Sequence, residues 1–256
     1  MMEQDLKGQV SIVTGAARGI GRAIARTLAE RGSHVMVVDV IDGAEAVDEI
    51  SAAVDGRVRI ASSIVDVRDR AQVRACVASV VETFGSISIM VNNAGTCGRV
   101  DLEMMDDETW ERDIETNLHG TFLFTQAAIY PYMKQAGFGR IINISSISGI
   151  MGGPFASGDG ANRSGPAYAA SKGGVIAFTK WVAKEVGVFG ITSNTVAPGP
   201  ISTPMTASAN YSLGTHAIKR MGTPEDIATA VAYLASPSSG FVTGDTLKVD
   251  GGTAIG

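Results

Sequence analysis

The segment TGAARGIG at positions 14–21 constrains the fold more than any other part of the sequence. It follows the apolar run QVSIVTG at 9–15 and precedes residues whose apolar positions recur with a helical period. Gly15 permits a tight turn, Gly19 lets the backbone approach a phosphate, and Gly21 lets a helix pack close to a strand. Strand, loop and helix in this order direct backbone N–H groups and a helix dipole at a pyrophosphate. The segment therefore predicts a dinucleotide-binding unit.

The rest of the chain repeats this alternation of short apolar runs and helical patterns. The further candidate strands lie at 34–40, 58–67, 88–95, 140–146, 191–199 and 246–252. Most are rich in Val and Ile, which is typical of strands covered on both faces. Helical spacing runs over 20–28 and 73–84, and the sequence TPED at 223–226 indicates a helix start. This order predicts an α/β fold, a Rossmann-like doubly wound sheet of about seven parallel strands with helices on both faces, built as a single domain over 1–256.

Composition and charge exclude several classes of protein. The 256 residues are 45% hydrophobic and 18% charged, which is enough apolar material for a sizeable core. A net charge of −5 argues against nucleic acid or an anionic membrane as partner. The first 15 residues do not resemble a signal peptide, so we expect a cytoplasmic protein. Two cysteines make no disulfide framework, and the three histidines lack metal-ligand spacing, so we expect no metal.

The second candidate strand ends in Asp39, which bears on the choice of dinucleotide. An acid at this point can accept hydrogen bonds from the adenosine ribose hydroxyls and repel a 2′-phosphate. Asp39 therefore favours NAD over NADP. Arg18, inside the glycine loop, could pair with a 2′-phosphate and therefore favours NADP. A second basic residue at position 40 would strengthen that preference, but this position is Val40.

Eight motifs in a fixed order extend this interpretation to nearly the whole chain. They are TGAARGIG (14–21), DV (66–67), NNAG (92–95), Asn117 in ETNLHG, the serine in NISSISG (143–149), YAASK (168–172), APGPISTP (197–204) and VDGG (249–252). With these motifs the sequence resembles the classical short-chain dehydrogenase/reductase (SDR) family. The resemblance implies a nicotinamide cofactor, a soluble enzyme acting on a small alcohol or carbonyl compound, and a homotetramer. The apolar segments 121–130 and 173–186 suit the faces of such a tetramer and equally suit burial against the sheet.

The resemblance also assigns cofactor contacts along the chain. Asp66 and Val67 would border the adenine, and Asn93, Ala94 and Gly95 would lie along the cofactor ribose. Pro198, Gly199, Ile201 and Thr203 would hold the nicotinamide carboxamide. Together with the residues discussed above, the implied cofactor-binding set is Gly15, Arg18, Gly19, Ile20, Gly21, Asp39, Asp66, Val67, Asn93, Ala94, Gly95, Tyr168, Lys172, Pro198, Gly199, Ile201 and Thr203.

Tyr168 and Lys172 are the candidates for proton transfer. A phenol with a reference pKa of about 10 is a poor base at neutral pH. Because the two residues are spaced i, i+4 on a helix, the ammonium lies beside the phenol, and with a positively charged nicotinamide it should lower that pKa. Tyr168 would then take or donate the proton while nicotinamide C4 takes or donates the hydride.

Two further residues complete the catalytic set implied by the resemblance. The family pattern places the active serine three residues before Gly149, which is Ser146, with Ser145 as the alternative. Ser146 would hydrogen-bond the reacting oxygen and stabilise its developing charge. Asn117 would position a water that links Lys172 to solvent.

Two polar stretches, 152–167 and 200–222, fall where substrate-side loops are expected. Ser146 and Tyr168 are 22 residues apart, a longer gap than is usual in the family. The excess is either a flap for a polar or anionic substrate, with Arg163 as a contact, or a solvated insertion. In the second stretch, Met205, Tyr211 and Leu213 either line an apolar wall or pack against neighbours. Cys97 either points into the pocket or is a spectator.

The first functional interpretation is an NAD(H)-dependent oxidoreductase that interconverts a secondary alcohol and a ketone. Its substrate would be a small polar alcohol, polyol, sugar or hydroxy acid. The second is an NADPH-dependent 3-oxoacyl-thioester reductase of the acyl-carrier-protein type, which Arg18 favours and Asp39 opposes. The third is a catalytically silent dinucleotide-binding regulator. A regulator of this kind would lack one or more catalytic residues, but the sequence contains all four of them: Asn117, Ser146, Tyr168 and Lys172.

Overall fold

A computed structural model describes residues 4–153, 164–207, 209, 211, 213, 214 and 216–255. Its central feature is a sheet of seven parallel strands in the order β3-β2-β1-β4-β5-β6-β7. The strands are β1 (Val10–Thr14), β2 (His34–Asp39), β3 (Ile60–Ile64), β4 (Ile89–Asn92), β5 (Gly139–Ile144), β6 (Ile191–Pro198) and β7 (Thr246–Val249). Six of these lie within a run expected from the sequence and β5 begins one residue before its run, so the predicted seven-stranded parallel sheet is confirmed.

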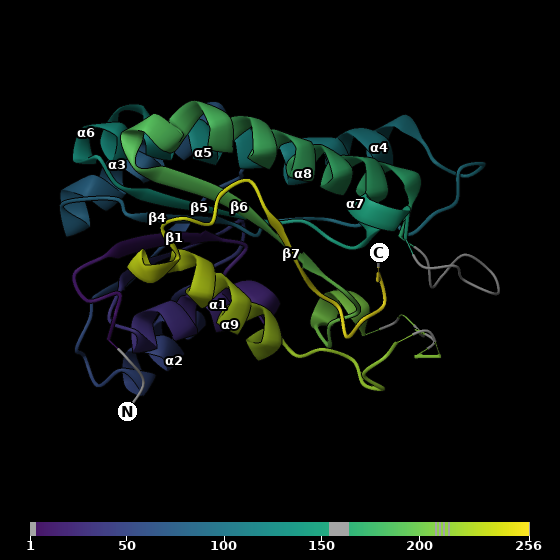
Figure 1. The fold of residues 1–256 in the computed structure, drawn as a ribbon, viewed down its shortest axis with the longest axis horizontal. Helices are drawn as coiled ribbons and strands as arrows, with labels where there is room; N and C mark the ends of the chain where they lie inside the picture. Colours follow the sequence, from purple (N-terminus) through teal and green to yellow (C-terminus); the bar gives the residue numbers. More distant parts are fainter. Residues whose placement is uncertain are drawn as a thin grey trace.

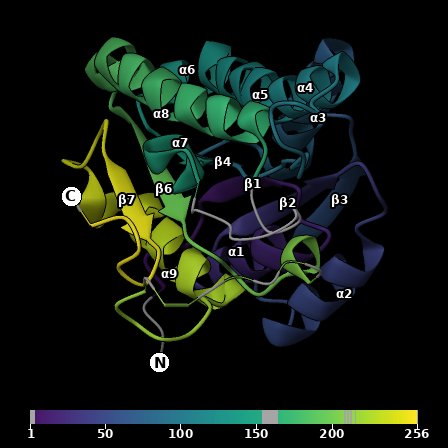
Figure 2. The same cartoon turned by 90° about the vertical axis from the view of Figure 1, so that its right-hand side faces the viewer.

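Helices cover both faces of this sheet (Figures 1 and 2). One layer holds α1 (Gly19–Glu30), α2 (Ala44–Ala53) and α9 (Pro224–Ala235), and the other holds α3 (Arg70–Phe84), α4 (Asp107–Ile114), α5 (Gly120–Ala128) and α8 (Pro166–Val186). Shorter pieces are the π-helices η1 (Glu115–His119) and η2 (Ile129–Met133), the helices α6 (Lys134–Ala136) and α7 (Ser148–Met151), and the 3₁₀ turns η3 (Gly187–Phe189), η4 (Pro204–Thr206) and η5 (Pro237–Ser239). The doubly wound architecture is therefore as predicted.

The two layers enclose two separate apolar cores, which explains the composition of the strands. In β1, Val13 belongs to the core beneath α1 and α9, whereas Ile12 belongs to the core beneath α3 and α5. Successive side chains of a strand point to opposite faces, so a strand covered on both sides needs apolar residues at every position. The edge strands β3 and β7 are only partly buried, and Ile64 is 64% exposed.

The order of the strands determines where a ligand can bind. The sheet grows from β1 toward β2 on one side and toward β4 on the other. Chains that leave the ends of β1 and β4 therefore diverge to opposite faces and open a crevice at the carboxyl edge of the sheet. Thr14 and Asn92 are the last residues of these two strands.

The helix starts follow capping chemistry that is visible in the sequence. At α9 the Thr223 hydroxyl accepts a hydrogen bond from the Asp226 backbone N–H, and the Asp226 carboxylate accepts one from the Thr223 N–H at 2.8 Å. The guanidinium of Arg220 beside Asp226 lowers the pKa of that carboxyl to about 2. The helix start expected at 223–226 is thus confirmed.

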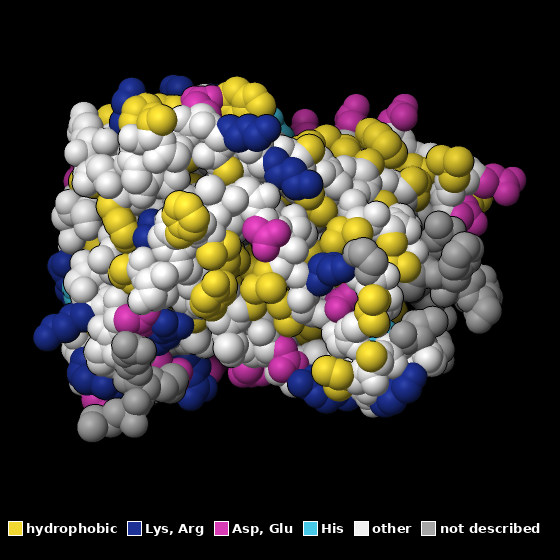
Figure 3. All heavy atoms as spheres, in the orientation of Figure 1, with side chains coloured by type: hydrophobic (Ala, Val, Ile, Leu, Met, Phe, Trp, Pro, Cys, Tyr) yellow, Lys and Arg dark blue, Asp and Glu magenta, His cyan; other side chains and the backbone are white. Residues whose placement is uncertain are grey.

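The surface view in Figure 3 shows acidic and basic side chains interspersed with apolar ones over one broad face of the molecule. Within the part of the chain that the structure describes, no helix is both long and apolar enough to cross a membrane.

The packing of the glycine loop predicts the effect of replacing Gly21 with alanine. A Cβ at this position would overlap the Gly15 carbonyl oxygen and lie 2.6 Å from Asn93 Nδ2. Because the overlap is with backbone, we expect Gly21→Ala to lower the free energy of unfolding by about 2–4 kcal/mol in urea denaturation. The control is Gly187→Ala, where a Cβ would meet nothing within 4 Å. Equal stability of the two variants would contradict this account.

Candidate functional site

One cavity of about 720 Å³ opens at the carboxyl ends of β1, β2, β4, β5 and β6. It brings together almost every residue that the sequence analysis selected. The predicted residues that line it are Gly15, Arg18, Gly19, Ile20, Asp39, Asp66, Val67, Asn93, Ala94, Gly95, Ser146, Tyr168, Lys172, Pro198, Gly199, Ile201 and Thr203. The two others, Gly21 and Asn117, are not among the lining residues but contact residues that are. Gly21 packs against Gly15 and Asn93, and Asn117 hydrogen-bonds to the backbone of Thr96.

Hydrogen bonds fix the glycine loop to the segment that follows β4. The Thr14 hydroxyl accepts from the backbone N–H groups of Asn93 and Ala94, each at 3.0 Å. The Asn93 amide in turn donates to the carbonyls of Thr14 and Gly15 at 2.9 and 3.0 Å. Gly15 has a φ of +63°, and a Cβ there would lie 2.8 Å from the Ala94 Cα. Sequence analysis missed Thr14, although it is the first letter of the TGAARGIG motif.

Asp39 connects the end of β2 to the same loop. Its Oδ2 accepts from the Ala17 N–H at 3.0 Å, and its Oδ1 accepts from the Val40 N–H at 2.8 Å. These bonds leave free lone pairs on a half-buried carboxylate that faces the cavity. Arg18, by contrast, is exposed at the N-cap of α1.

These features fit a nicotinamide dinucleotide. Three of the eight residues in the loop are glycines, the first turn of α1 has no side-chain cap for its N–H groups, and an acid stands where the adenosine ribose is expected. Further along the cavity, Asp66 forms a 2.6 Å ion pair with Arg68, which lowers the pKa of Asp66. Val67 packs behind it against Gly120.

Tyr168 is the third residue of α8, and Lys172 lies four residues, about one turn, further along the helix. Gly165 caps this helix and Pro166 occupies its first turn. Lys172 is 4% exposed, its Nζ donates to the Ile144 carbonyl at 2.8 Å, and this nitrogen lies 5.7 Å from the centroid of the Tyr168 ring. Burial lowers the pKa of Lys172 to about 8.

The pKa of Tyr168 differs from the expectation drawn from the sequence. We expected the ammonium of Lys172 together with a positively charged nicotinamide to lower it; among the groups of the chain itself, burial raises it, and Cys97 adds to the effect. A hydrogen bond from Ser146 and the charge of Arg99 act in the opposite direction without offsetting the burial. The ammonium is directed in part toward the Ile144 carbonyl. Within the chain alone, burial therefore favours the neutral phenol of Tyr168.

The two candidate serines are placed differently. The Ser145 hydroxyl donates to the Lys172 backbone carbonyl at 2.7 Å and so ties β5 to α8. The Ser146 hydroxyl accepts from the Ser148 N–H at 3.1 Å and hydrogen-bonds the phenol of Tyr168. Ser146, and not Ser145, is therefore placed to hydrogen-bond the same substrate oxygen as Tyr168.

Asn117 is fully buried within η1, a π-helical turn between α4 and α5. Its amide donates to the Thr96 carbonyl at 3.0 Å and to the Ser171 hydroxyl at 2.9 Å, and its Oδ1 accepts from the Thr96 N–H at 2.8 Å. The side chain therefore joins the segment after β4 to α8. Single π-turns are frequent at functional sites. The role of Asn117 in holding a water stays a prediction.

Buried polar residues that the sequence analysis missed support these elements from behind. Asn92 donates to Asn143 at 2.7 Å, and Asn143 donates to Thr179 at 2.8 Å, which links β4, β5 and α8. Asp113, fully buried, accepts from Thr96 Oγ1 at 2.8 Å and from the Gly98 N–H at 2.7 Å. The sequence did contain a signal for Asp113: it lies four residues before Asn117, so helical spacing places the two side chains on the same face.

The substrate-side loops are described in part. Met205, Tyr211 and Cys97 line the cavity, whereas Leu213 is not among its lining residues. Burial raises the pKa of the Cys97 thiol. Positions 154–163, including Arg163, lie outside the described residues, and so does most of the proposed flap.

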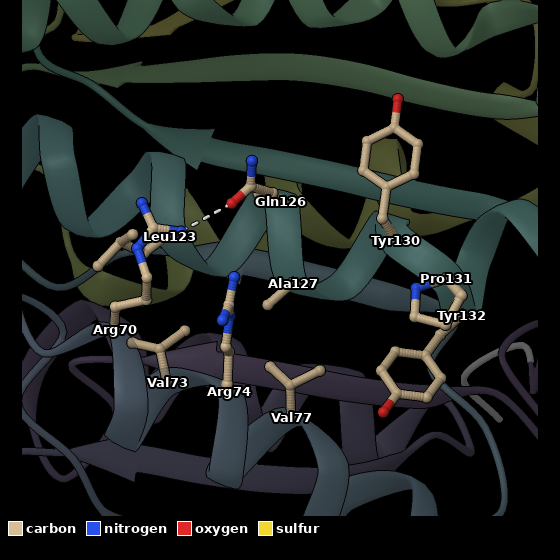
Figure 4. Close-up of a pocket in the computed structure, with 10 residues that line it drawn as sticks. All are labelled: Arg70, Val73, Arg74, Val77, Leu123, Gln126, Ala127, Tyr130, Pro131 and Tyr132. Carbon is tan, nitrogen blue, oxygen red and sulfur yellow. Dashed lines mark hydrogen bonds between the residues drawn. The ribbon is translucent and has the colours of Figure 1, made fainter.

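A second cavity, of about 560 Å³, lies between α3, α5 and η2 (Figure 4). Arg70 and Arg74 point toward it, and Arg70 donates to the Gln126 side chain at 2.8 Å. None of the predicted site residues lines it. It coincides with part of the segment 121–130, for which an interface between subunits stays a prediction.

Comparisons with known proteins agree with this geometry. The family model described as enoyl-(acyl carrier protein) reductase matches residues 15–254. The chain belongs to the short-chain dehydrogenase/reductase family. It is an oxidoreductase by that membership, as the resemblance implied, and the family binds a nicotinamide cofactor.

Individual relatives refine the comparison. The chain is 41% identical to the 3-oxoacyl-(acyl-carrier-protein) reductase of Vibrio cholerae over 253 residues, which cover 97% of this chain and 98% of that protein. The Escherichia coli reductase of the same name is 40% identical, with 97% and 98% covered. The trans-4-hydroxycyclohexanecarboxylate dehydrogenase of Sinomonas cyclohexanicum is 39% identical, with 97% and 93% covered. The relatives favour the thioester reductase, which was our second interpretation, over the alcohol dehydrogenase, which was our first.

The lowered pKa of Lys172 predicts a pH dependence of stability. An unfolded lysine keeps its proton up to about pH 10.5, whereas the buried one loses it near pH 8. Between these values the unfolded chain binds more protons, so the free energy of unfolding rises with pH. Relative to Lys172→Met, the wild type should gain about 1–2 kcal/mol between pH 7.5 and 9.5, measured by urea denaturation. Lys180→Met, on the exposed side of α8, should run parallel to the wild type. A wild-type curve parallel to Lys172→Met would rule out a buried, discharged lysine.

Proposed function

We propose that this chain reduces the C3 carbonyl of a 3-oxoacyl thioester to the 3-hydroxy compound. The observation that carries the proposal is the hydrogen-bonded pair of Tyr168 and Ser146 in the wall of the cavity that the predicted cofactor-binding residues also line. The relatives named as 3-oxoacyl-(acyl-carrier-protein) reductases support the substrate class. We further propose that 1–256 form one functional domain, since all the described strands belong to one sheet.

The residues of the site divide the chemistry among them. Ser146 and Tyr168 would donate hydrogen bonds to the substrate carbonyl oxygen, polarise the bond and stabilise the developing alkoxide. Tyr168 would then transfer its proton to that oxygen. The bound nicotinamide cofactor supplies the hydride. Lys172, with a pKa of about 8, carries a proton that exchanges near neutral pH and stabilises the transient phenolate.

The cofactor choice we propose is NADH. Asp39 lines the cavity at the end of β2, where an acidic side chain disfavours a 2′-phosphate, and the residue after it is Val40. Arg18, also in the cavity lining, is the feature that favours NADPH.

A second candidate function is the oxidation of a small secondary alcohol with NAD⁺, our first interpretation of the sequence. Asp39 supports it, and so does the dehydrogenase from Sinomonas cyclohexanicum, whose name specifies a ring alcohol that bears a carboxylate.

Turnover of acetoacetyl-N-acetylcysteamine tests the thioester proposal. We expect the wild type to reduce it, and Tyr168→Phe to lose about 10³-fold in kcat because the proton donor is gone. Ser146→Ala should lose about 10²-fold. Tyr233→Phe, on the exposed side of α9, is the matched control and should keep full activity. Negligible turnover by the wild type with either cofactor would reject the thioester and favour the second candidate.

Cofactor affinity tests the role of Asp39 independently of turnover. Asp39→Asn keeps the size of the side chain and removes its charge, so we expect NADPH to bind about tenfold more tightly and NADH somewhat more weakly. Calorimetry on the protein without substrate measures both dissociation constants. Asp42→Asn, whose carboxylate caps the Ala44 N–H outside the cavity, is the control. An unchanged NADPH affinity in Asp39→Asn would show that this charge does not select the cofactor.

A further inference from the structure

Arg99 lines the cavity, and the proposed reaction gives it no role. It lies in the segment between β4 and α4 and lines the cavity together with Ser146, Tyr168 and Tyr211. Its Nη1 is shielded from solvent and has no hydrogen-bond partner among the described residues. Its Nη2 reaches the Met205 carbonyl only at 3.5 Å, the outer limit of a hydrogen bond.

The charge of Arg99 is also uncompensated within the described chain. A guanidinium stays protonated in proteins, so Arg99 is a cation at every relevant pH. No described acid forms an ion pair with it: Asp101, two residues on, accepts from the Met104 N–H, Asp113 pairs with Arg112 at 3.0 Å, and Asp66 pairs with Arg68. Tyr211 is a neutral partner: its ring centroid lies 5.7 Å from the guanidinium carbon, and its hydroxyl is a side-chain hydrogen-bond partner of Arg99.

A half-buried guanidinium whose shielded N–H groups have no acceptor is costly unless an anion meets it. Burial opposes the charge, yet Tyr211 and Cys97 offset it, and the pKa of Arg99 is raised. The positive charge also reaches the reaction centre, because it acts to lower the pKa of Tyr168. A ligand that touches Tyr168 therefore lies within the field of Arg99.

We infer that Arg99 binds a substrate carboxylate, so that the enzyme also interconverts free short-chain 3-oxo and 3-hydroxy acids. A carboxylate can accept two parallel hydrogen bonds from a guanidinium, which is the strongest pairing available to this side chain. The inference rests on the carbonyl chemistry proposed for Tyr168 but not on the thioester. In a free 3-oxo acid the carboxylate takes the place of the thioester group, two carbons from the reacting carbonyl.

The reaction balances with the groups already assigned. The C3 carbonyl carbon gains a hydride and its oxygen gains the Tyr168 proton, so the ketone becomes a secondary alcohol and the reduced nicotinamide becomes oxidised. The carboxylate at C1 is unchanged. The reverse reaction returns the proton to Tyr168 and the hydride to the oxidised cofactor.

Binding of a charged and a neutral ligand separates this role from a structural one. Calorimetry is carried out on the enzyme saturated with oxidised cofactor, which cannot reduce a ketone, with acetoacetate and with methyl acetoacetate. We expect Arg99→Met to weaken acetoacetate about 30-fold and methyl acetoacetate less than threefold. Arg99→Lys, which keeps the charge but not the fork, should recover part of the loss. Arg70→Met, in the second cavity, is the matched control and should bind both ligands as the wild type does.

Three outcomes overturn the inference. They are acetoacetate that fails to bind the wild type at millimolar concentration, equal weakening of both ligands in Arg99→Met, and no weakening of either. The thioester proposal has its own readout, turnover of acetoacetyl-N-acetylcysteamine. If that turnover is absent while acetoacetate still binds through Arg99 and is reduced, the thioester proposal fails and the carboxylate assignment stands.

Discussion

The hydroxyl of Thr14 is the contact on which the arrangement of the site depends. It accepts two backbone N–H groups from the segment after β4, and so fixes the glycine loop to the neighbouring strand end. Without these hydrogen bonds, the glycine loop after β1 and the segment after β4, which form the two sides of the crevice, would not be fixed to each other. Gly15 and Gly21 allow the close approach, because a Cβ at either position would meet backbone or the Asn93 amide. The cofactor half of the cavity is thus held by backbone geometry.

The substrate half is held differently, by side chains on helices. Asn117 joins the segment after β4 to α8, and Ser145 joins β5 to the same helix. Tyr168 and Lys172 therefore sit on an element tied to its surroundings on two sides. Their burial makes the phenol harder and the ammonium easier to deprotonate. A neutral phenol beside a lysine that exchanges its proton near neutral pH suits a site that delivers protons to an oxygen.

Much of this could be predicted from the sequence, because strand periodicity and glycine spacing report local requirements. The seven strands, the starts of α1 and α9, and the residues gathered around one cavity follow from such local patterns. The sign of the Tyr168 shift did not, because it depends on how deeply the phenol is buried, and i, i+4 spacing carries no information about depth. Arg99 and Asp113 were missed for a related reason. Their importance comes from partners, or from the lack of them, that only the folded chain reveals. The ranking of thioester against alcohol rested on Asp39 and on Val40 beside it, and residues that face the cofactor say little about the substrate.

The way in which α8 is attached to the sheet also bears on how the substrate range of the enzyme can change in evolution. Asn143 bonds to Thr179, and Ser145 bonds to the Lys172 carbonyl seven residues, or about two turns, earlier on the helix. Two bonds at different heights along β5 prevent the helix from sliding or turning about its axis. The position of Tyr168 is then set by the sheet and not by the chain that leads into the helix. A lineage can lengthen, shorten or rewrite that chain to accommodate new substrates while the reactive phenol stays where it was.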